Sequence, residues 1–281
     1  MGGKFPTDPA VLNKALDLRG IKIASQWFSS FLCSTPYEEN EKAFIEQLDF
    51  LEAVGASRIN VCELTRCLFA EECSMFGDNK PIATDEEWDK LTDGLNKLGK
   101  IAADRGFKLC FHHHMATVVQ TFEETKRLMD NTDPRYVYLC FDTGHFTFSK
   151  EDAVKAAKEF GPRIGHVHLK DIRPDMMEKA YAEGFKFRKA VLEGCFTIPG
   201  DGCVDYPGVF KALHDAHYEG WFIVEAEQDP AKANPLEYAK MAREYIKKPQ
   251  VSDKEDYNGE DSFRYRWYRY DGPYARHQPA A

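Results

Sequence analysis

The chain has 281 residues, of which 43% are hydrophobic and 30% charged, proportions typical of a globular rather than a disordered protein. Its formal net charge of −9 argues against general binding to nucleic acid or to an anionic membrane. No apolar run approaches the roughly 20 residues that span a bilayer, and the first residues lack the apolar segment of a signal peptide. We therefore expect a cytoplasmic protein whose length suits one parallel α/β barrel of about 250 residues.

Short β-rich runs alternate with helix-like stretches along the chain. Strands separated by helices of ten or more residues favour right-handed βαβ units and hence a parallel sheet. The pattern predicts six strands, at Ile21–Phe28, Arg58–Cys62, Phe107–His112, Tyr136–Asp142, Arg163–Leu169 and Trp221–Glu225.

Helix boundaries are marked by capping sequences. The clearest helix, Asp85–Arg105, carries one apolar stripe and follows the capping box Thr84–Glu87. Thr121–Glu124 predicts another helix start of the same kind, and Ser149–Asp152 is a looser version. The first helix-like stretch is Pro9–Arg19.

Two segments break this alternation. The connection Leu169–Tyr206 is long for a barrel, with an expected short helix at Asp175–Ala182, and long loops on barrels are usually functional. From Lys248 onward the chain is polar and then aromatic, so we expect a barrel domain at 1–247 and a tail at 248–281. Alternating aromatic residues in 263–267 suggest a strand that packs on the barrel or a neighbouring subunit, or else a disordered tail.

Several common sites are excluded. Pro199–Gly202 is a tight-turn sequence and not the G-x-G-x-x-G fingerprint of dinucleotide binding, and we find neither a P-loop nor a nucleophile elbow. The eight cysteines form no C-x-x-C pair, and we expect them to be reduced and structural.

Four successive predicted strands end in carboxylates or imidazoles. In a parallel barrel the carboxyl ends of the strands meet at one face, where catalytic residues lie. Imidazole and carboxylate together suit a divalent metal such as Mn²⁺, Fe²⁺, Co²⁺ or Zn²⁺, and thiolates are absent from these strand ends. Glu225 and Glu227 share a face, so either could be a ligand on geometry alone. The strand-end residues are His112–His114, Asp142, His145, His166, His168, Lys170, Asp171, Arg173, Glu225 and Glu227.

Each of these residues taken singly has a simpler explanation. His113 and His114 could be loop residues that bond to the backbone, and Asp142 with Thr143 could cap a helix. Lys170, Asp171 and Arg173 could form a solvated ion-pair cluster. Four such strand ends together nevertheless favour a metal site over four unrelated polar residues on the surface.

Three of these motifs resemble a known family. His112–His114, Asp142–His145 and His166–Asp171 are similar to the xylose-isomerase-like barrel superfamily of sugar isomerases and epimerases. The resemblance covers about residues 2–246 and implies a (β/α)8 TIM-type barrel. Narrower motifs resemble the branch of this superfamily that dehydrates cyclic keto-polyols; they are Trp27–Ser30, Val119–Thr121, Phe196–Gly202, Glu225–Pro230 and Asn234–Tyr238.

The resemblance also implies the roles of individual residues. The cofactor would be a divalent metal, Mn²⁺ or Co²⁺ before Fe²⁺, Zn²⁺ or Mg²⁺, with no nucleic-acid or membrane partner. The metal ligands would be His112, Asp142, His168 and Glu225. Acid–base candidates are His113, His145 and Glu227, and the substrate contacts would be Trp27, His114, Lys170 and Arg173.

The implied reaction is the dehydration of 2-keto-myo-inositol to a trihydroxycyclohexane-dione in inositol catabolism. Alternatives are a sugar isomerase or epimerase, or a subunit that cleaves carbon-linked glycosides, both through the same enediolate chemistry. A truncated, inactive relative that binds metal or sugar is a further alternative.

The chain departs from the family at its start. Only six strands are predicted, and Pro9–Arg19 would follow the family's second strand, so the first strand, first helix and second strand are expected to be missing. Three explanations compete: an internal methionine taken as the start, a second copy or partner chain that supplies the missing part and covers the open edge, or a degenerate relative.

Overall fold

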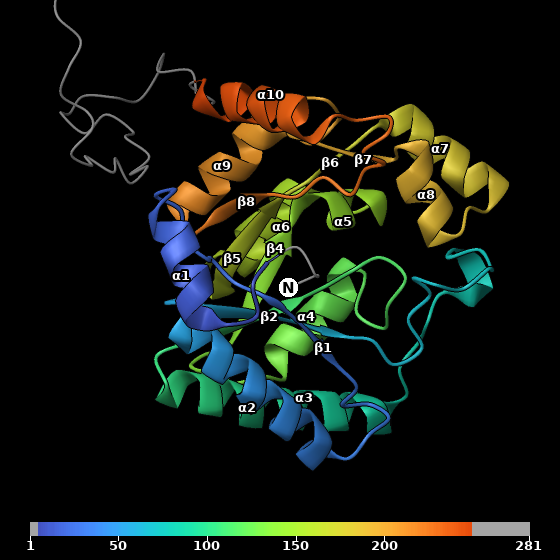
Figure 1. Ribbon diagram of the computed structural model, residues 1–281. Helices are drawn as coiled ribbons and strands as arrows, with labels where there is room; N and C mark the ends of the chain where they lie inside the picture. The colour runs from blue at the N-terminus through green and yellow to red at the C-terminus, as the bar shows by residue number, and fades with distance from the viewer. Residues whose placement is uncertain (1–4, 249–281) are drawn as a thin grey trace, which may run out of the picture.

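The computed structural model describes residues 5–248, and within them six parallel strands form one sheet (Figure 1). All neighbouring strands pair in parallel, as the alternation of strands and helices predicts, and the order follows the chain, β1-β2-β3-β4-β5-β8. This is the parallel α/β architecture of a TIM barrel. The strands are β1 (Trp27–Ser30), β2 (Arg58–Glu63), β3 (Lys108–His112), β4 (Val137–Asp142), β5 (Ile164–Leu169) and β8 (Phe222–Val224).

The predicted strand Ile21–Phe28 is wrong in its bounds. Strand β1 begins only at Trp27 and runs on to Ser30, pairing with Asn60–Glu63 of β2. Before it, the Gln26 carbonyl accepts a bond from the Asn60 amide, and Ile21 is half exposed. Because β1 is an outer strand of the described sheet, residues 21–26 have a neighbouring strand on one side at most, despite their β-rich sequence.

Helices connect the strands and cover the sheet. In the view of Figure 1, α2 and α3 lie below the strands, α9 and α10 lie above them, and α7 and α8 lie to the right, while buried residues of α2, α3, α9 and α10 share one apolar core with the strands. The helices are α1 (Pro9–Asp17), α2 (Tyr37–Ala53), α3 (Asp85–Asp104), α4 (Phe122–Asp130), α5 (Thr143–Phe148), α6 (Ala153–Phe160), α7 (Pro174–Glu183), α8 (Phe187–Glu193), α9 (Tyr206–Asp215) and α10 (Pro235–Lys247), with 3₁₀ turns at Gly77–Asn79 and Gly161–Arg163.

The two strong capping predictions are confirmed. Thr84 and Thr121 each accept from the backbone three residues on, and Glu87 and Glu124 complete the boxes that start α3 and α4. The weaker prediction at Ser149 is wrong. Ser149 ends α5 and donates to the His145 carbonyl, whereas Asp152 itself caps α6 through the amides of the next helix. Because Asp152 itself accepts from the first amides of α6, the helix begins three residues later than a cap at Ser149 would place it.

The two faces of the sheet bury different side chains. Outward-facing residues such as Val61, Leu109 and Leu139 join the apolar core with helix residues that include Leu48 and Leu95. Each such fully buried side chain contributes about 1.5–3 kcal/mol. The inward-facing residues are polar or sulfur-bearing. Asn60, Cys110, Cys140 and His166 lie there and are all buried. All eight cysteines are free, as expected.

The long connection after β5 is anchored by a buried aspartate. Strand β6 (Asp171–Ile172) pairs antiparallel with β7 (Phe196–Thr197). The Asp171 carboxylate accepts backbone bonds from Ile172, Gly200 and Val204, at 2.9, 3.0 and 2.9 Å. A Cβ at Gly202 would lie 2.2 Å from Asp171 Oδ1, so this position of the turn requires glycine. Lys170 and Asp171 are both buried, which contradicts the solvated ion-pair explanation.

Strands β1 and β8 are the outer strands of the sheet within residues 5–248. The absence of one strand, one helix and a second strand from an eight-unit barrel stays a prediction. The division into a domain at 1–247 and a tail at 248–281 is also untested, and the predicted aromatic strand lies outside the described residues. No helix among the described residues combines the length and apolarity needed to cross a membrane.

Candidate metal centre and acid–base site

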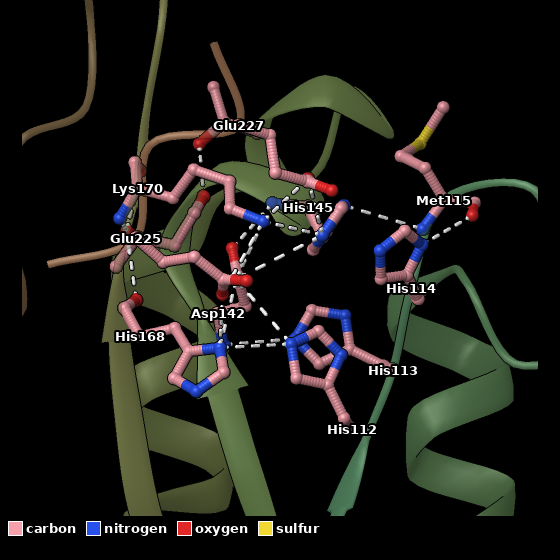
Figure 2. A network of polar contacts seen from close by, with 12 residues as sticks. His112, His113, His114, Met115, Asp142, His145, His168, Lys170, Glu225 and Glu227 are labelled. Carbon is pink, nitrogen blue, oxygen red and sulfur yellow. Dashed lines mark hydrogen bonds and ion pairs between the residues drawn. The ribbon is translucent and has the colours of Figure 1, made fainter. Parts of the chain in front are cut away.

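The four predicted metal ligands meet at the carboxyl ends of four strands. His112 ends β3, Asp142 ends β4, His168 lies one residue before the end of β5, and Glu225 directly follows β8. One ligand atom from each lies within 4.8 Å of all the others. His112 Nε2 is 3.1 Å from His168 Nδ1, and Glu225 Oε2 is 2.6 Å from the same nitrogen (Figure 2).

Asp142 has two separate tasks, one for each carboxylate oxygen. Its Oδ1 accepts from the His145 amide at 2.9 Å and caps α5, which confirms the capping interpretation. Its Oδ2 is buried, accepts no hydrogen bond among the described residues, and lies 3.5 Å from both His112 Nε2 and His168 Nδ1. The capping role and the proposed metal role are therefore compatible, because they use different atoms.

The protonation of the cluster suits a cation. Burial opposes the charge on Asp142, but Lys170 and His145 outweigh burial and hold the pKa of Asp142 well below its usual range. Burial likewise opposes the charge on Glu225, and Lys170 with His168 overcomes it and lowers the pKa of Glu225. Burial lowers the pKa of His112, which keeps that ring neutral. The cluster thus offers two carboxylates and a neutral imidazole, while the raised pKa of His168 means that this ring must lose a proton before it binds a metal.

Two unsatisfied buried oxygens show that these residues fit a divalent cation. Asp142 Oδ2 and Glu225 Oε2 are both buried without a regular hydrogen bond among the described residues, and both point at ring nitrogens, Glu225 Oε2 in an ion pair with His168 Nδ1 at 2.6 Å. Buried polar atoms are normally satisfied, so such a pair is a place where a cation restores the balance. Two imidazoles and two carboxylates are borderline-to-hard ligands, which Mn²⁺, Co²⁺, Fe²⁺ and Zn²⁺ all accept.

A thiol lies close to this cluster, which the sequence interpretation missed. The sulfur of Cys140 is within 4.8 Å of ligand atoms of His112 and His168, because Cys140 precedes Asp142 by two residues on the same face of β4. Burial raises the pKa of Cys140, and thiols bind metals as thiolates. The protonated form is therefore a poor ligand in this structure.

Next to the metal cluster, a buried ammonium joins the proposed acid–base residues. Lys170 Nζ lies 2.9 Å from His145 Nε2 and 2.8 Å from Glu227 Oε2 (Figure 2). It also lies 3.4 Å from Asp142 Oδ2 and 3.6 Å from Glu225 Oε2. The ligand atoms of His114, His145 and Glu227 are close enough to hold a second ion, but the ammonium already supplies a cation between His145 and Glu227.

The motif that follows Asp142 makes room for this lysine. A Cβ at Gly144 would lie 2.5 Å from Lys170 Cγ, so only glycine lets the Lys170 stem pass. Thr143 accepts from the Lys170 amide at 3.0 Å and donates to the Lys170 carbonyl at 2.7 Å. The Asp-Thr-Gly-His sequence thus provides one metal-cluster residue, two residues that position Lys170, and His145, which bonds to its ammonium.

The three predicted acid–base residues differ in their surroundings. His145 and Glu227 face Lys170, whereas the His113 ring stacks on Phe146 at 3.7 Å and its Nε2 accepts from the Asp142 amide. Burial lowers the pKa of His145 well below its usual value, so its ring is neutral. Burial raises the pKa of Glu227 despite Lys170. His113 contacts the cluster through the Asp142 backbone amide and by stacking on the His112 ring.

The predicted substrate-binding residues also separate. The Trp27 ring lies 5.3 Å from His112 and 5.9 Å from His114, beside the cluster. The His114 ring lies 3.6 Å from the His145 ring at a tilt of 40°, and its Nδ1 donates to the Met115 carbonyl at 2.7 Å. The Arg173 guanidinium instead donates to the Gly194 carbonyl and to side chains of the long connection, which are Thr197 and Asp201.

Sequence reasoning missed several residues of the site. Phe69 lies 4.5 Å from the His114 ring and 5.1 Å from Phe187, and it comes from the loop after β2, where no periodic pattern marks it. The Phe196 ring lies 5.5 Å from the His145 ring, and Phe196 belongs to the motif Phe196–Gly202, which resembles the family but predicted no role for this residue. Asn60 contacts His168 from below, and its position on the inner face of β2 was the available signal.

Comparisons with known proteins agree with this geometry. A family model described as xylose isomerase-like TIM barrel matches residues 4–248. An inosose dehydratase of Clostridium perfringens is 52% identical over 247 residues, which are 88% of this chain and 83% of that protein.

Solved structures share the fold at lower identity. A probable 3-DHS dehydratase of Bacillus anthracis involved in petrobactin synthesis has a TM-score of 0.64 at 16% identity, covering 84% of this chain and 81% of that one. The IOLI protein with a bound zinc atom has a TM-score of 0.62 at 17% identity, covering 83% and 79%. The chain belongs to the xylose isomerase-like TIM barrel family and, within it, to the inosose dehydratases.

Proposed function

We propose that this chain is a hydro-lyase that converts 2-keto-myo-inositol to a trihydroxycyclohexane-dione and water, with a divalent metal as cofactor. The observation that carries the proposal is the four-residue cluster of His112, Asp142, His168 and Glu225 beside a buried Lys170–His145–Glu227 set. The 52% identity to an inosose dehydratase supports the choice of this reaction among those open to such a cluster.

The reaction removes the proton α to the ketone and expels the hydroxyl at the β position as water. His145 suits the role of base, because burial keeps its ring neutral; its Nε2 would take up the proton on giving up the hydrogen bond from Lys170. Glu227 suits the role of acid, because burial raises its pKa and favours a protonated carboxyl that can donate to the leaving hydroxyl. Lys170 holds both groups in place through its two hydrogen bonds.

A bound divalent cation would supply positive charge where negative charge develops on the substrate carbonyl oxygen. The protein's own part is to hold the four ligands at the strand ends and to keep Lys170 positively charged beside them. Three carboxylates, those of Asp142, Glu225 and Glu227, raise the pKa of Lys170 against the effect of burial. Lys170 therefore keeps its positive charge beside the metal ligands.

The finer assignments are proposals. Mn²⁺ or Co²⁺ suits the mixed nitrogen and oxygen ligands, with Fe²⁺, Zn²⁺ or Mg²⁺ as further candidates. Trp27 and His114 are well placed to line the substrate pocket beside His112, and Arg173 would act on substrate only if the long connection moves toward the cluster. A cytoplasmic location and a homo-oligomer or partner subunit at the sheet edge stay predictions.

The test starts from purified protein stripped with a chelator and reloaded with Mn²⁺. We expect about one metal per chain and the appearance of dione absorbance after addition of 2-keto-myo-inositol. Asp142→Ala should abolish both metal binding and product. Loaded protein that forms no dione would overturn the proposed reaction. Formation of an isomeric keto-sugar without loss of water would favour the isomerase or epimerase alternative.

A further inference from the structure

A polar layer lies directly beneath the metal cluster, on the inner face of the sheet. Asn60 of β2 is 3% exposed and His166 of β5 is fully buried, and Ser25 lies between them. The interiors of parallel barrels are usually filled by bulky branched apolar side chains. A hydrogen-bonding layer at this level therefore needs a reason.

The layer contacts one metal-cluster residue from behind. Asn60 Nδ2 lies 3.3 Å from His168 Nε2 and 3.1 Å from Ser25 Oγ, and Ser25 Oγ lies 3.2 Å from His166 Nε2. The other amide atom of Asn60, Oδ1, is buried and has no partner among the described residues. The contact crosses the interior between strands that are not neighbours in the sheet.

The proton on His168 decides which atom of Asn60 must face the ring. His168 Nδ1 is the nitrogen that points at His112, Asp142 and Glu225, so it is the ligand atom. An imidazole that binds a metal through one nitrogen carries its proton on the other, and that proton is normally donated to an acceptor. His168 Nε2 is then a donor, and an amide nitrogen opposite it would be a second donor.

Rotation of the Asn60 amide by half a turn resolves this conflict. The oxygen and nitrogen of an amide are nearly the same size, so the 3.3 and 3.1 Å contacts are kept. Asn60 Oδ1 then accepts from His168 Nε2 and from the Ser25 hydroxyl, and Ser25 accepts from His166 Nε2. Every proton along these contacts then has an acceptor, while Nδ2 takes the buried position of Oδ1, where no partner is found among the described residues.

We propose that Asn60 is a positioning residue of the metal centre, whose side-chain oxygen accepts the Nε2 proton of His168 and so aims Nδ1 at the metal. The inference rests on the metal centre of the proposed function. Ser25 and His166 support Asn60 from below and fix the orientation of its amide. Partners of this kind typically contribute a factor of about 10–100 to metal affinity.

The first experiment measures Mn²⁺ affinity, without substrate, for three variants by calorimetry. Asn60→Ala should weaken Mn²⁺ binding by about 10–100-fold. Asn60→Asp keeps an acceptor at the same place and should bind Mn²⁺ at least as tightly as the parent protein. Asn40→Ala removes another buried asparagine, on α2, whose amide contacts Phe31 and Thr35, and should leave Mn²⁺ affinity unchanged.

A second measurement uses the unaltered protein and does not depend on the folding of a variant. With Zn²⁺ as a diamagnetic metal, nitrogen-15 spectra should place the single His168 proton on Nε2, with slow exchange against water. Asn60→Asp should keep that signal.

Three results would overturn the proposal. They are Asn60→Ala with parental Mn²⁺ affinity, Asn60→Asp as weak as Asn60→Ala, or a metal-loaded His168 without a proton on Nε2. Protein that binds no metal at all would overturn both this proposal and the metal centre. Protein that binds metal with the expected dependence on Asn60 but forms no dione would overturn only the proposed reaction.

Discussion

Glu63 and Asp142 are two buried carboxylates that end two parallel strands, and only one of them faces the metal cluster. Glu63 ends β2, and its oxygens accept from the Ser30 hydroxyl and from the amides of Leu32 and Thr65, at 2.9, 2.9 and 3.0 Å. Asp142 ends β4 and accepts one amide bond at Oδ1, while Oδ2 has no donor among the described residues.

The difference shows that a strand-end position alone does not make a ligand. Glu63 closes the loop after β1 through its three donors, and burial raises its pKa. Asp142 keeps an unsatisfied oxygen beside two imidazoles and an ammonium, which lower its pKa. Whether donors of the protein already occupy an oxygen decides whether that oxygen is available to a cation.

The largest expected effect comes from Asp142→Asn. The asparagine oxygen can still cap α5, because asparagine is as good a cap as aspartate, but the negative charge at the cluster is lost. Loss of a residue that only supports a metal ligand weakens metal binding by up to roughly 100-fold, and we expect the loss of Mn²⁺ affinity in Asp142→Asn to be larger than that. Dehydration should become undetectable. Calorimetry and the dione assay check both results.

The matched control for Asp142→Asn is Glu63→Gln. The amide nitrogen of the glutamine would face one of the three groups that donate to Glu63, and the loss of that hydrogen bond should lower the free energy of unfolding by about 1–3 kcal/mol. Mn²⁺ affinity should stay within about twofold, since no ligand changes. Equal losses of metal affinity in the two variants would remove the distinction between these carboxylates.

An intermediate effect is expected from Lys170→Met. The change removes the ammonium that holds His145 and Glu227, so kcat should fall by about 10²–10⁴-fold at saturating Mn²⁺. Mn²⁺ affinity should be equal or tighter, because the ammonium no longer competes for Asp142 and Glu225. Lys211→Met, at an exposed ion pair on α9, is the control and should change neither quantity. Parental kcat in Lys170→Met would exclude Lys170 from the reaction.

The smallest expected effect is a pH dependence of metal binding. Burial lowers the pKa of His168, but Cys140, Glu225 and Asp142 outweigh it and raise this pKa well above its ordinary value. His168 therefore holds an extra proton at neutral pH, and the metal must displace it. Mn²⁺ affinity should rise about tenfold per pH unit until the pKa of His168 is passed, with one proton released. Calorimetry in two buffers of different ionisation enthalpy measures that proton, and a flat profile would contradict the assignment.

Much of the site was predictable from local sequence. The period of two along each run and the parallel order place His112, Asp142, His168 and Glu225 at one end of the sheet. The capping boxes at Thr84 and Thr121 were also readable, because a cap satisfies helix amides only a few residues away. The bounds of β1 were not predictable, since they depend on pairing with a neighbouring strand.

The sequence by itself determined the alternation of strands and helices, the strand-end residues and the two capping boxes, because all of these arise from contacts within a few residues. Only the tertiary structure decided which carboxylate faces which partner. It placed Glu225 against His168 and Glu227 against Lys170, and it brought Asn60 to His168 across 108 residues of chain. Such pairings depend on strand register and on the distance across the sheet interior, and neither is encoded in a local pattern.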